Sequence, residues 1–139
     1  MDIDISDLLT ARFDEKGSGH GSYNCWTLCQ EVARRAGEKM ISFAGWVERL
    51  SERDCILRNF SESKQFERLT NPEPFCLIGF LNRKGKLSHI GIVLKDCKSF
   101  IHIRRKIGVK IDRLDDPDFK DRIYGFYKYV EHSEVEKSA

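Results

Sequence analysis

The hydrophobic pattern of this 139-residue chain changes at one short segment, residues 71–75, which reads NPEPF. Before the segment, apolar residues recur at helical spacing; after it, short apolar or alternating runs are separated by turn residues. The two prolines of the segment stop any continuing helix, because proline has no backbone N–H to donate. Helices followed by strands predict an α+β fold in which N-terminal helices pack on an antiparallel sheet.

The clearest helix is predicted from Asn24, a good N-terminal cap, to Gly37, a natural C-terminal stop. A second helix is predicted to start near Ser42, with apolar residues on one stripe as far as Leu50. Three segments are less regular. Residues 1–15 are predicted to form a short helix, residues 16–23 a loop, and residues 61–69 a short turn or helix.

The second half of the chain predicts an antiparallel meander of about five strands. The expected strands cover residues 75–81, 87–94, 99–105, 106–114 and 122–130. We expect one domain over residues 18–130, with an N-terminal segment over 1–17 and a polar tail over 131–139.

Charge and hydropathy exclude several classes of partner. Charged residues make up 33% of the chain but nearly cancel, to a net charge of +2, so we expect no nucleic-acid partner. No apolar run approaches the ~20 residues that span a bilayer, and no secretion signal is visible, so we expect no membrane span and a cytoplasmic protein.

The chain has five cysteines, which we expect to be free thiols in a reducing compartment. No CxxC pair is present, and we expect no metal and no cofactor. One alternative is a Cys2His2 zinc site made by Cys25, Cys29, His89 and His102. Thiols spaced i, i+4 on a helix are more often core residues, which makes this alternative the weaker one.

Cys25 stands at the first position of the predicted helix, directly after the Asn24 cap. The free N–H groups and the dipole at a helix start favour a thiolate and can stabilise an oxyanion. The position therefore suits a nucleophile, although a buried structural cysteine fits it about as well.

A thiolate needs a base, and two histidines lie within the predicted strands. If the turn between residues 94 and 99 is a tight hairpin, His102 faces Gly91, and His89 lies on the same face two residues away. The two imidazoles are then diagonal neighbours, so one can take the thiol proton while the other orients it. Two ordinary half-buried strand histidines are the alternative.

Three segments resemble the NlpC-type family of papain-like cysteine peptidases, which are best known as cell-wall endopeptidases. They are YNCWTLCQEV, LSHIGIVL and FIHIRRKIGVKIDRL; RIYGFYKY also resembles the family's closing strand, and NCW is similar to phage-tail versions. The resemblance implies a papain-like fold, with Cys25 as nucleophile, His89 as base and His102 as orienting residue. It further implies a peptide or peptidoglycan substrate, hydrolysed through an acyl-enzyme, in a cytoplasmic or phage-associated protein.

Other residues near these motifs are candidates for substrate or oxyanion contacts: Tyr23, Trp26 and Arg104. Arg104 can pair with a substrate carboxylate, with a solvated surface charge as the alternative. Two departures from the family's pattern affect the substrate class: a bulky residue, Trp26, follows the nucleophile, and no Gly-Asp pair opens the first strand. Acyl transfer or deamidation on the same site, and an inactive phage-tail assembly or binding module, are the alternative functions.

Overall fold

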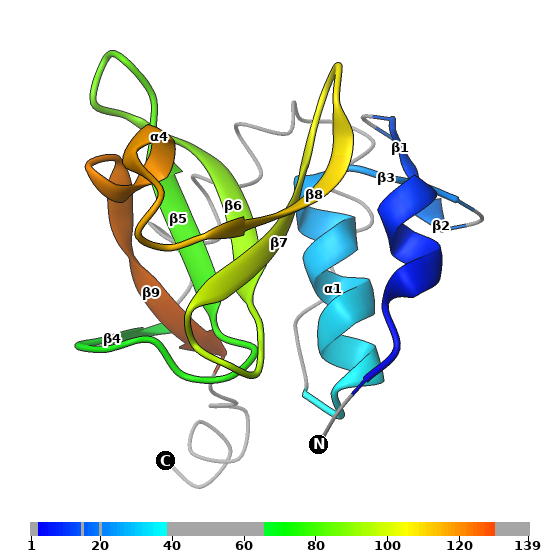
Figure 1. Ribbon diagram of the computed structural model, residues 1–139, viewed down its shortest axis with the longest axis horizontal. Helices are drawn as coiled ribbons and strands as arrows, with labels where there is room; N and C mark the ends of the chain where they lie inside the picture. The colour runs from blue at the N-terminus through cyan, green and yellow to red at the C-terminus, as the bar shows by residue number, and fades with distance from the viewer. Residues whose placement is uncertain (1–2, 15, 20, 39–65, 130–139) are drawn as a thin grey trace, which may run out of the picture.

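The computed structural model describes residues 3–14, 16–19, 21–38 and 66–129. Figure 1 shows a curved sheet with one long helix, α1, packed beside it. The six strands of the sheet are ordered β4-β9-β5-β6-β7-β8, and all neighbouring pairs are antiparallel. Their bounds are Phe66–Leu69 (β4), Leu77–Leu81 (β5), Leu87–Val93 (β6), Ser99–Arg104 (β7), Gly108–Arg113 (β8) and Ile123–Tyr129 (β9). The α+β prediction is therefore confirmed.

Helix α1 covers Cys25–Arg35, and its start is fixed by a reciprocal cap. The Asn24 side chain accepts from the Thr27 N–H at 2.8 Å, and the Thr27 hydroxyl accepts from the Asn24 N–H at 2.9 Å. These bonds satisfy backbone donors that have no partner within the helix. The chain leaves the helix through Gly37, whose φ of +77° suits a residue without a side chain.

The hairpin of β6 and β7 has the predicted register, because Ile92 pairs with Ile101 and Val93 with Phe100. A β carbon added to Gly91 would lie 3.1 Å from the β carbon of His102, so Gly91 does lie against this histidine. The simple meander is wrong in one respect: β9 returns to pair with β5, on the side of β5 away from β6.

Three further predictions need correction. The segment 61–69 was expected as a turn or helix, but its described part, Phe66–Leu69, is strand β4. The loop expected over 16–23 contains two short strands, and a short helix interrupts the strand region after β8. The two strands are β2 (Ser18–Gly19) and β3 (Ser22–Tyr23), and the helix is α4 (Pro117–Lys120). Strand β3 lies between β2 and β1 (Arg12–Phe13) in a small three-stranded sheet. The helix predicted near residue 42 lies outside the described residues.

The apolar residues form two clusters on the two faces of the large sheet. The helix-side core joins α1 to the alternate strand residues that face it, among them Ile90, Ile92, Ile101 and Ile103. The far-side core lies on the other face and contains Ile78, Phe80, Val93, Phe100 and Phe119. Alternation along β7 assigns Ile101 and Ile103 to one face and Phe100 and His102 to the other.

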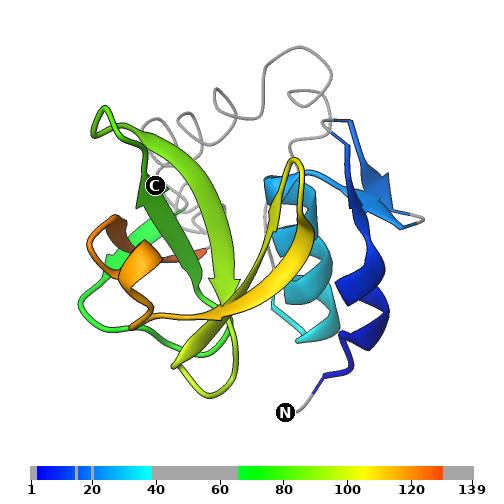
Figure 2. The same cartoon turned by 45° about the horizontal axis from the view of Figure 1, so that its top comes forward.

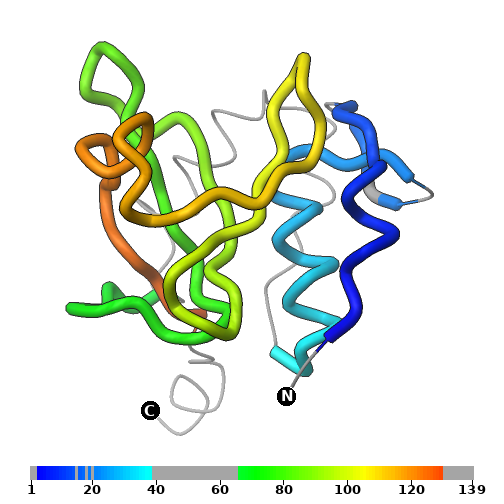
Figure 3. The backbone as a smooth tube through the Cα atoms, viewed as in Figure 1, coloured from blue at the N-terminus to red at the C-terminus, as the bar shows by residue number. Residues whose placement is uncertain are grey.

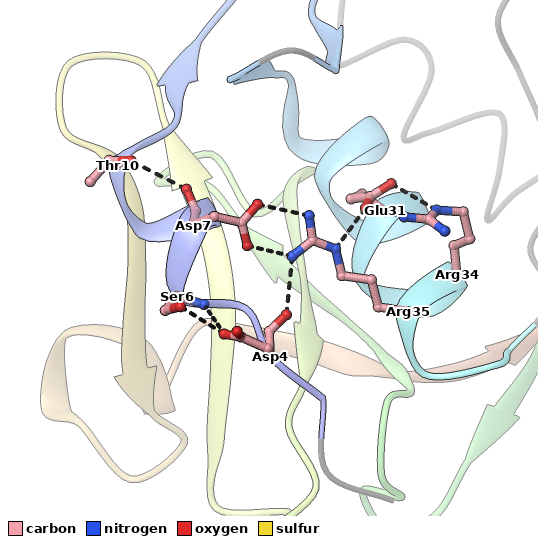
Figure 4. Close-up of polar contacts among 7 residues, drawn as sticks. All are labelled: Asp4, Ser6, Asp7, Thr10, Glu31, Arg34 and Arg35. Carbon is pink, nitrogen blue, oxygen red and sulfur yellow. Dashed lines mark hydrogen bonds and ion pairs between the residues drawn. The ribbon is translucent and has the colours of Figure 1, made fainter.

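The N-terminal 3-10 helix η1, Ser6–Thr10, packs beside α1 (Figure 3). Leu8 and Ala11 are buried in the helix-side core. Arg35 of α1 ties the two helices together: it binds Asp7 at 2.6 Å and Glu31 at 2.6 Å, and it donates to the Asp4 carbonyl at 3.0 Å (Figure 4). Residues before position 18 thus share the core of the rest of the chain. Among the described residues, no helix has the length and apolar character needed to cross a membrane.

Candidate active site

Cys25 occupies the first position of α1, as predicted, and it is fully buried, with 0% of its surface exposed. The loop before it is held against the helix, because the Thr27 hydroxyl donates to the Gly17 carbonyl at 2.7 Å. Gly17 itself lies so close to the backbone of residues 22–23 that a β carbon would be 2.6 Å from the Tyr23 nitrogen. The start of α1 is therefore a tightly packed and well-defined position.

The two strand histidines lie in direct contact. The His89 Nε2 and His102 Nδ1 atoms are 2.8 Å apart, and the ring centroids are 5.1 Å apart. His102 is buried, with 1% of its surface exposed, whereas His89 is half-buried. The hairpin register accounts for the contact between the two rings. His89 and His102 are diagonal neighbours, and Gly91 leaves no side chain in the space opposite His102.

A carboxylate extends the pair to a chain of three groups. The Asp112 Oδ2 atom, on β8, lies 2.7 Å from the His102 Nε2 atom. Because a carboxylate only accepts, His102 donates from Nε2, and its Nδ1 then accepts from the Nε2–H of His89. The remaining ring nitrogen of His89, Nδ1, is left with a free lone pair. Asp112 therefore sets the tautomer of both imidazoles.

Sequence reasoning did not single out Asp112, although a signal was present. In GVKIDR, Val109 and Ile111 alternate with Lys110 and Asp112. The observed register pairs His102 with Lys110 and Phe100 with Asp112, which makes Asp112 a diagonal neighbour of His102. Only the length of the turn between β7 and β8 was needed to place it there.

Both imidazoles are held in the neutral form at neutral pH. Burial lowers the pKa of His89 from 6.5 to about 3, and the charges of His102, Arg104 and Arg122 add to this effect. Burial also lowers the pKa of His102, while the hydrogen bond and charge of Asp112 act in the opposite direction. Neutral rings agree with the hydrogen bonds from His89 to Asp112. His102 donates once and accepts once, and His89 donates once and keeps one free lone pair.

The thiol and the imidazoles belong to different faces of the sheet. Cys25 packs in the helix-side core, whereas the His102 ring contacts Phe100 at 4.7 Å and Phe119 at 5.3 Å in the far-side core. The beginning of α1 and the beginning of β6 nevertheless lie toward the same end of the molecule (Figures 1 and 2).

Two of the predicted oxyanion and substrate residues, Tyr23 and Trp26, lie with Cys25 in the helix-side core. Tyr23 is buried, and its phenol lies in the field of Glu31 and Arg35, farther along α1; burial raises the pKa of Tyr23. Trp26 is buried with its ring edge against Phe66, at a centroid distance of 5.9 Å.

Arg104 has different surroundings. It is exposed and lines the same pocket as His89. The zinc alternative finds no support in the described residues, because no three His, Cys, Asp or Glu side chains there are grouped as metal ligands.

Comparison of the fold with solved structures finds clear relatives. NlpC1 and NlpC2 from Trichomonas vaginalis match with TM-scores of 0.60 and 0.61 at 16% and 15% identity, over 90% of this chain. A Staphylococcus aureus protein similar to lipoproteins of the NLP/P60 family matches with a TM-score of 0.58 at 18% identity, over 89% of this chain.

The match covers 41%, 44% and 38% of those three proteins, so this chain corresponds to less than half of each. No protein-family model and no curated protein matches the sequence. None of the three structures is of a phage protein, so the phage-tail part of the expectation has no support here. The predicted architecture is confirmed: this chain has the papain-like α+β fold of NlpC/P60 proteins.

Proposed function

We propose that the chain is a thiol-dependent amide hydrolase that cleaves peptide bonds, with peptidoglycan stem peptides as the first substrates to test. Cys25 is the nucleophile, His89 the base, and His102 and Asp112 position the base. The observation that carries the proposal is the hydrogen-bonded chain from His89 to Asp112, which leaves one lone pair on His89. This arrangement occurs in an NlpC/P60-type fold, at the end of the sheet where α1 begins.

In the proposed reaction, His89 Nδ1 takes the proton of the Cys25 thiol, and the sulfur attacks the carbonyl carbon. Free N–H groups of the first turn of α1 stabilise the oxyanion. The imidazolium then protonates the departing amine, which leaves an acyl-enzyme. Water, deprotonated by the same imidazole, hydrolyses the thioester and restores the thiol.

Cys25 has no exposed surface, so a substrate reaches the sulfur only after the covering side chains move aside. The same burial favours a second candidate function, an inactive relative that serves as a binding or assembly module. The two candidates differ in whether the sulfur becomes accessible in the folded protein.

Activity on stem peptides, followed by mass spectrometry of the products, tests the hydrolase. Cys25→Ser should abolish cleavage, while Cys97→Ser, at a half-exposed cysteine in the turn between β6 and β7, should leave it unchanged. Adding an amine acceptor separates acyl transfer from hydrolysis, because transfer yields a new amide instead of an acid. Cleavage that survives Cys25→Ser would rule out the proposed nucleophile.

Alkylation of the folded protein with iodoacetamide, read by peptide mass spectrometry, distinguishes the second candidate. A hydrolase requires that Cys25 is alkylated and that substrate slows the alkylation. A Cys25 that stays unmodified until the protein unfolds, like the buried Cys76, would favour the binding module.

A further inference from the structure

A pocket of about 360 Å³ opens beside His89, on the far side of the sheet. This volume is in the range of small-ligand sites. Apolar side chains, including Phe80 and Phe119, form part of its wall, together with the imidazole of His89. The proposed base therefore lies in the wall of a cavity that can hold a ligand.

The pocket carries a concentrated positive charge. Four arginines line it: Arg83, Arg104, Arg105 and Arg122. They come from three places in the chain, namely the β5–β6 turn, the end of β7 and the residue before β9. Among the described lining residues there is no aspartate or glutamate. The fold thus brings four guanidinium groups from distant segments to one cavity.

Two of these arginines, Arg105 and Arg122, are held in place without being neutralised. Arg122 lies over the Phe119 ring at 5.5 Å and donates to the Asp118 carbonyl at 3.0 Å, and Arg105 lies over the Phe13 ring at 5.0 Å. Within residues 3–14, 16–19, 21–38 and 66–129, none of the four forms an ion pair with a carboxylate.

Three arginines elsewhere in the molecule are neutralised by carboxylates. Arg34, Arg35 and Arg113 each bind a carboxylate at 2.6 to 2.9 Å. Arg12 and Arg68, which lie outside the pocket, also bind no carboxylate among the described residues, so what distinguishes the pocket is that four unpaired guanidinium groups gather around one cavity. Guanidinium groups bind carboxylates and phosphates through paired N–H donors, so the complementary ligand is an oxyanion.

We propose that this arginine pocket binds a carboxylate or phosphate group, and that it thereby selects anionic acyl substrates for the thiol site. The second part rests on the proposed function, whereas anion binding does not. A bound anion would also offset the guanidinium charges that face His89. Because those charges help to keep the imidazole neutral, the anion raises the pKa of His89 and makes it a stronger base when substrate is present.

Two probes test the binding, inorganic phosphate and the dicarboxylate glutarate, each titrated into the full chain at low ionic strength. NMR signals of the His89 imidazole report occupancy, and they should shift in a saturable way as the pKa of His89 rises. Tighter binding of phosphate identifies a phosphorylated ligand, and tighter binding of glutarate a carboxylate ligand. Absence of a saturable shift with either probe would overturn the proposal.

Arginine variants test which side chains bind the two anion probes. The double variant Arg104→Gln, Arg122→Gln should weaken binding about tenfold or more, as expected for the loss of two charged hydrogen-bonding partners. Arg34→Gln, which removes one positive charge from the exposed surface of α1, should bind the probes like the parent protein. Equal affinities of the double variant and the Arg34→Gln control would contradict the proposal.

Two additional variants keep the result interpretable. Arg104→Lys with Arg122→Lys retains the charge and the packing but loses the paired donors, so its affinity should fall between the parent and the double glutamine variant. Binding must also persist in Cys25→Ser, since the pocket does not use the thiol. Failure of catalysis with intact anion binding would then reject the hydrolase alone.

Discussion

The two faces of the large sheet use their residues for opposite purposes. The helix-side core is built mainly from aliphatic side chains, with buried thiols and the rings of Tyr23, Trp26 and Tyr127, and each of its strand isoleucines is at most 1% exposed. The far side combines aromatic rings with two histidines, a carboxylate and a cavity lined by arginines. Burying polar groups is costly unless they are paired, and on the far side His89, His102 and Asp112 pair with one another. The helix side should therefore govern stability, while the far side should supply the base that acts on Cys25 and the groups that position this base.

After the Cys25→Ser variant, the largest effect on activity should come from His89→Gln. Loss of a general base lowers turnover by about 10² to 10⁴-fold, while the free energy of unfolding should change little because the side chain is only half-buried. Steady-state kinetics and urea unfolding of the same variant measure both quantities. Unchanged turnover would show that His89 is not the base, and no catalytic role would then be left for the far side.

The largest effect on stability should come from the helix side. Ile92→Ala removes a side chain with 0% exposure that faces α1, and a deletion of this kind costs about 2 to 5 kcal/mol of unfolding free energy. Urea or thermal unfolding measures the loss. Turnover per folded molecule should be close to that of the parent protein. A large loss of turnover in the folded fraction would mean that the two faces are not independent.

Asp112→Ala should lower turnover by about 10 to 100-fold, the equivalent of losing one hydrogen bond to a charged group. The effect should fall on kcat rather than KM, because Asp112 contacts His102 and not the substrate. Asp112→Asn keeps an acceptor for His102 Nε2 and should lose less. Asp115→Ala removes an exposed carboxylate nearby and serves as the control. Equal kinetics of Asp112→Ala and this control would exclude a positioning role.

Stability should fall as the pH is lowered from about 6.5 toward about 3. In this window the unfolded chain takes up a proton on His89 that the folded chain rejects, so protonation favours unfolding. Below about pH 3 both states are protonated and this contribution is constant. Urea midpoints across the window measure the slope, which His89→Gln should reduce. The same slope in both proteins would show that the folded state does not hold this imidazole neutral.

The smallest effect on stability should come from Arg35→Gln, which breaks the link between η1 and α1 and changes neither the pocket lining nor the histidines. Of the three side chains only Asp7 is well exposed, and surface ion pairs each contribute about 0.2 to 1 kcal/mol, and less at high salt. Thermal unfolding at two salt concentrations should show a small difference that salt reduces. A loss as large as that of Ile92→Ala would mean that docking of η1 is essential to the helix-side core.

The amino-acid sequence by itself determined the α+β class, the helix beginning at Cys25 and the His89–His102 pair. These features depend on local rules, namely the Asn24 cap, the change of hydrophobic period at residues 71–75, and the length of one tight hairpin. The register of a short hairpin is set by its turn, so the spacing of residues along the chain is enough to identify a glycine opposite a histidine.

Only the tertiary structure decided what surrounds these residues. Asp112 reaches His102 through a second hairpin, β9 returns beside β5, and the four pocket arginines come from segments up to 39 positions apart in the sequence. The burial of Cys25 on one face and of His102 on the other depends on how the helix packs against the curved sheet. Such placements arise from long-range packing, which local spacing along the chain does not encode.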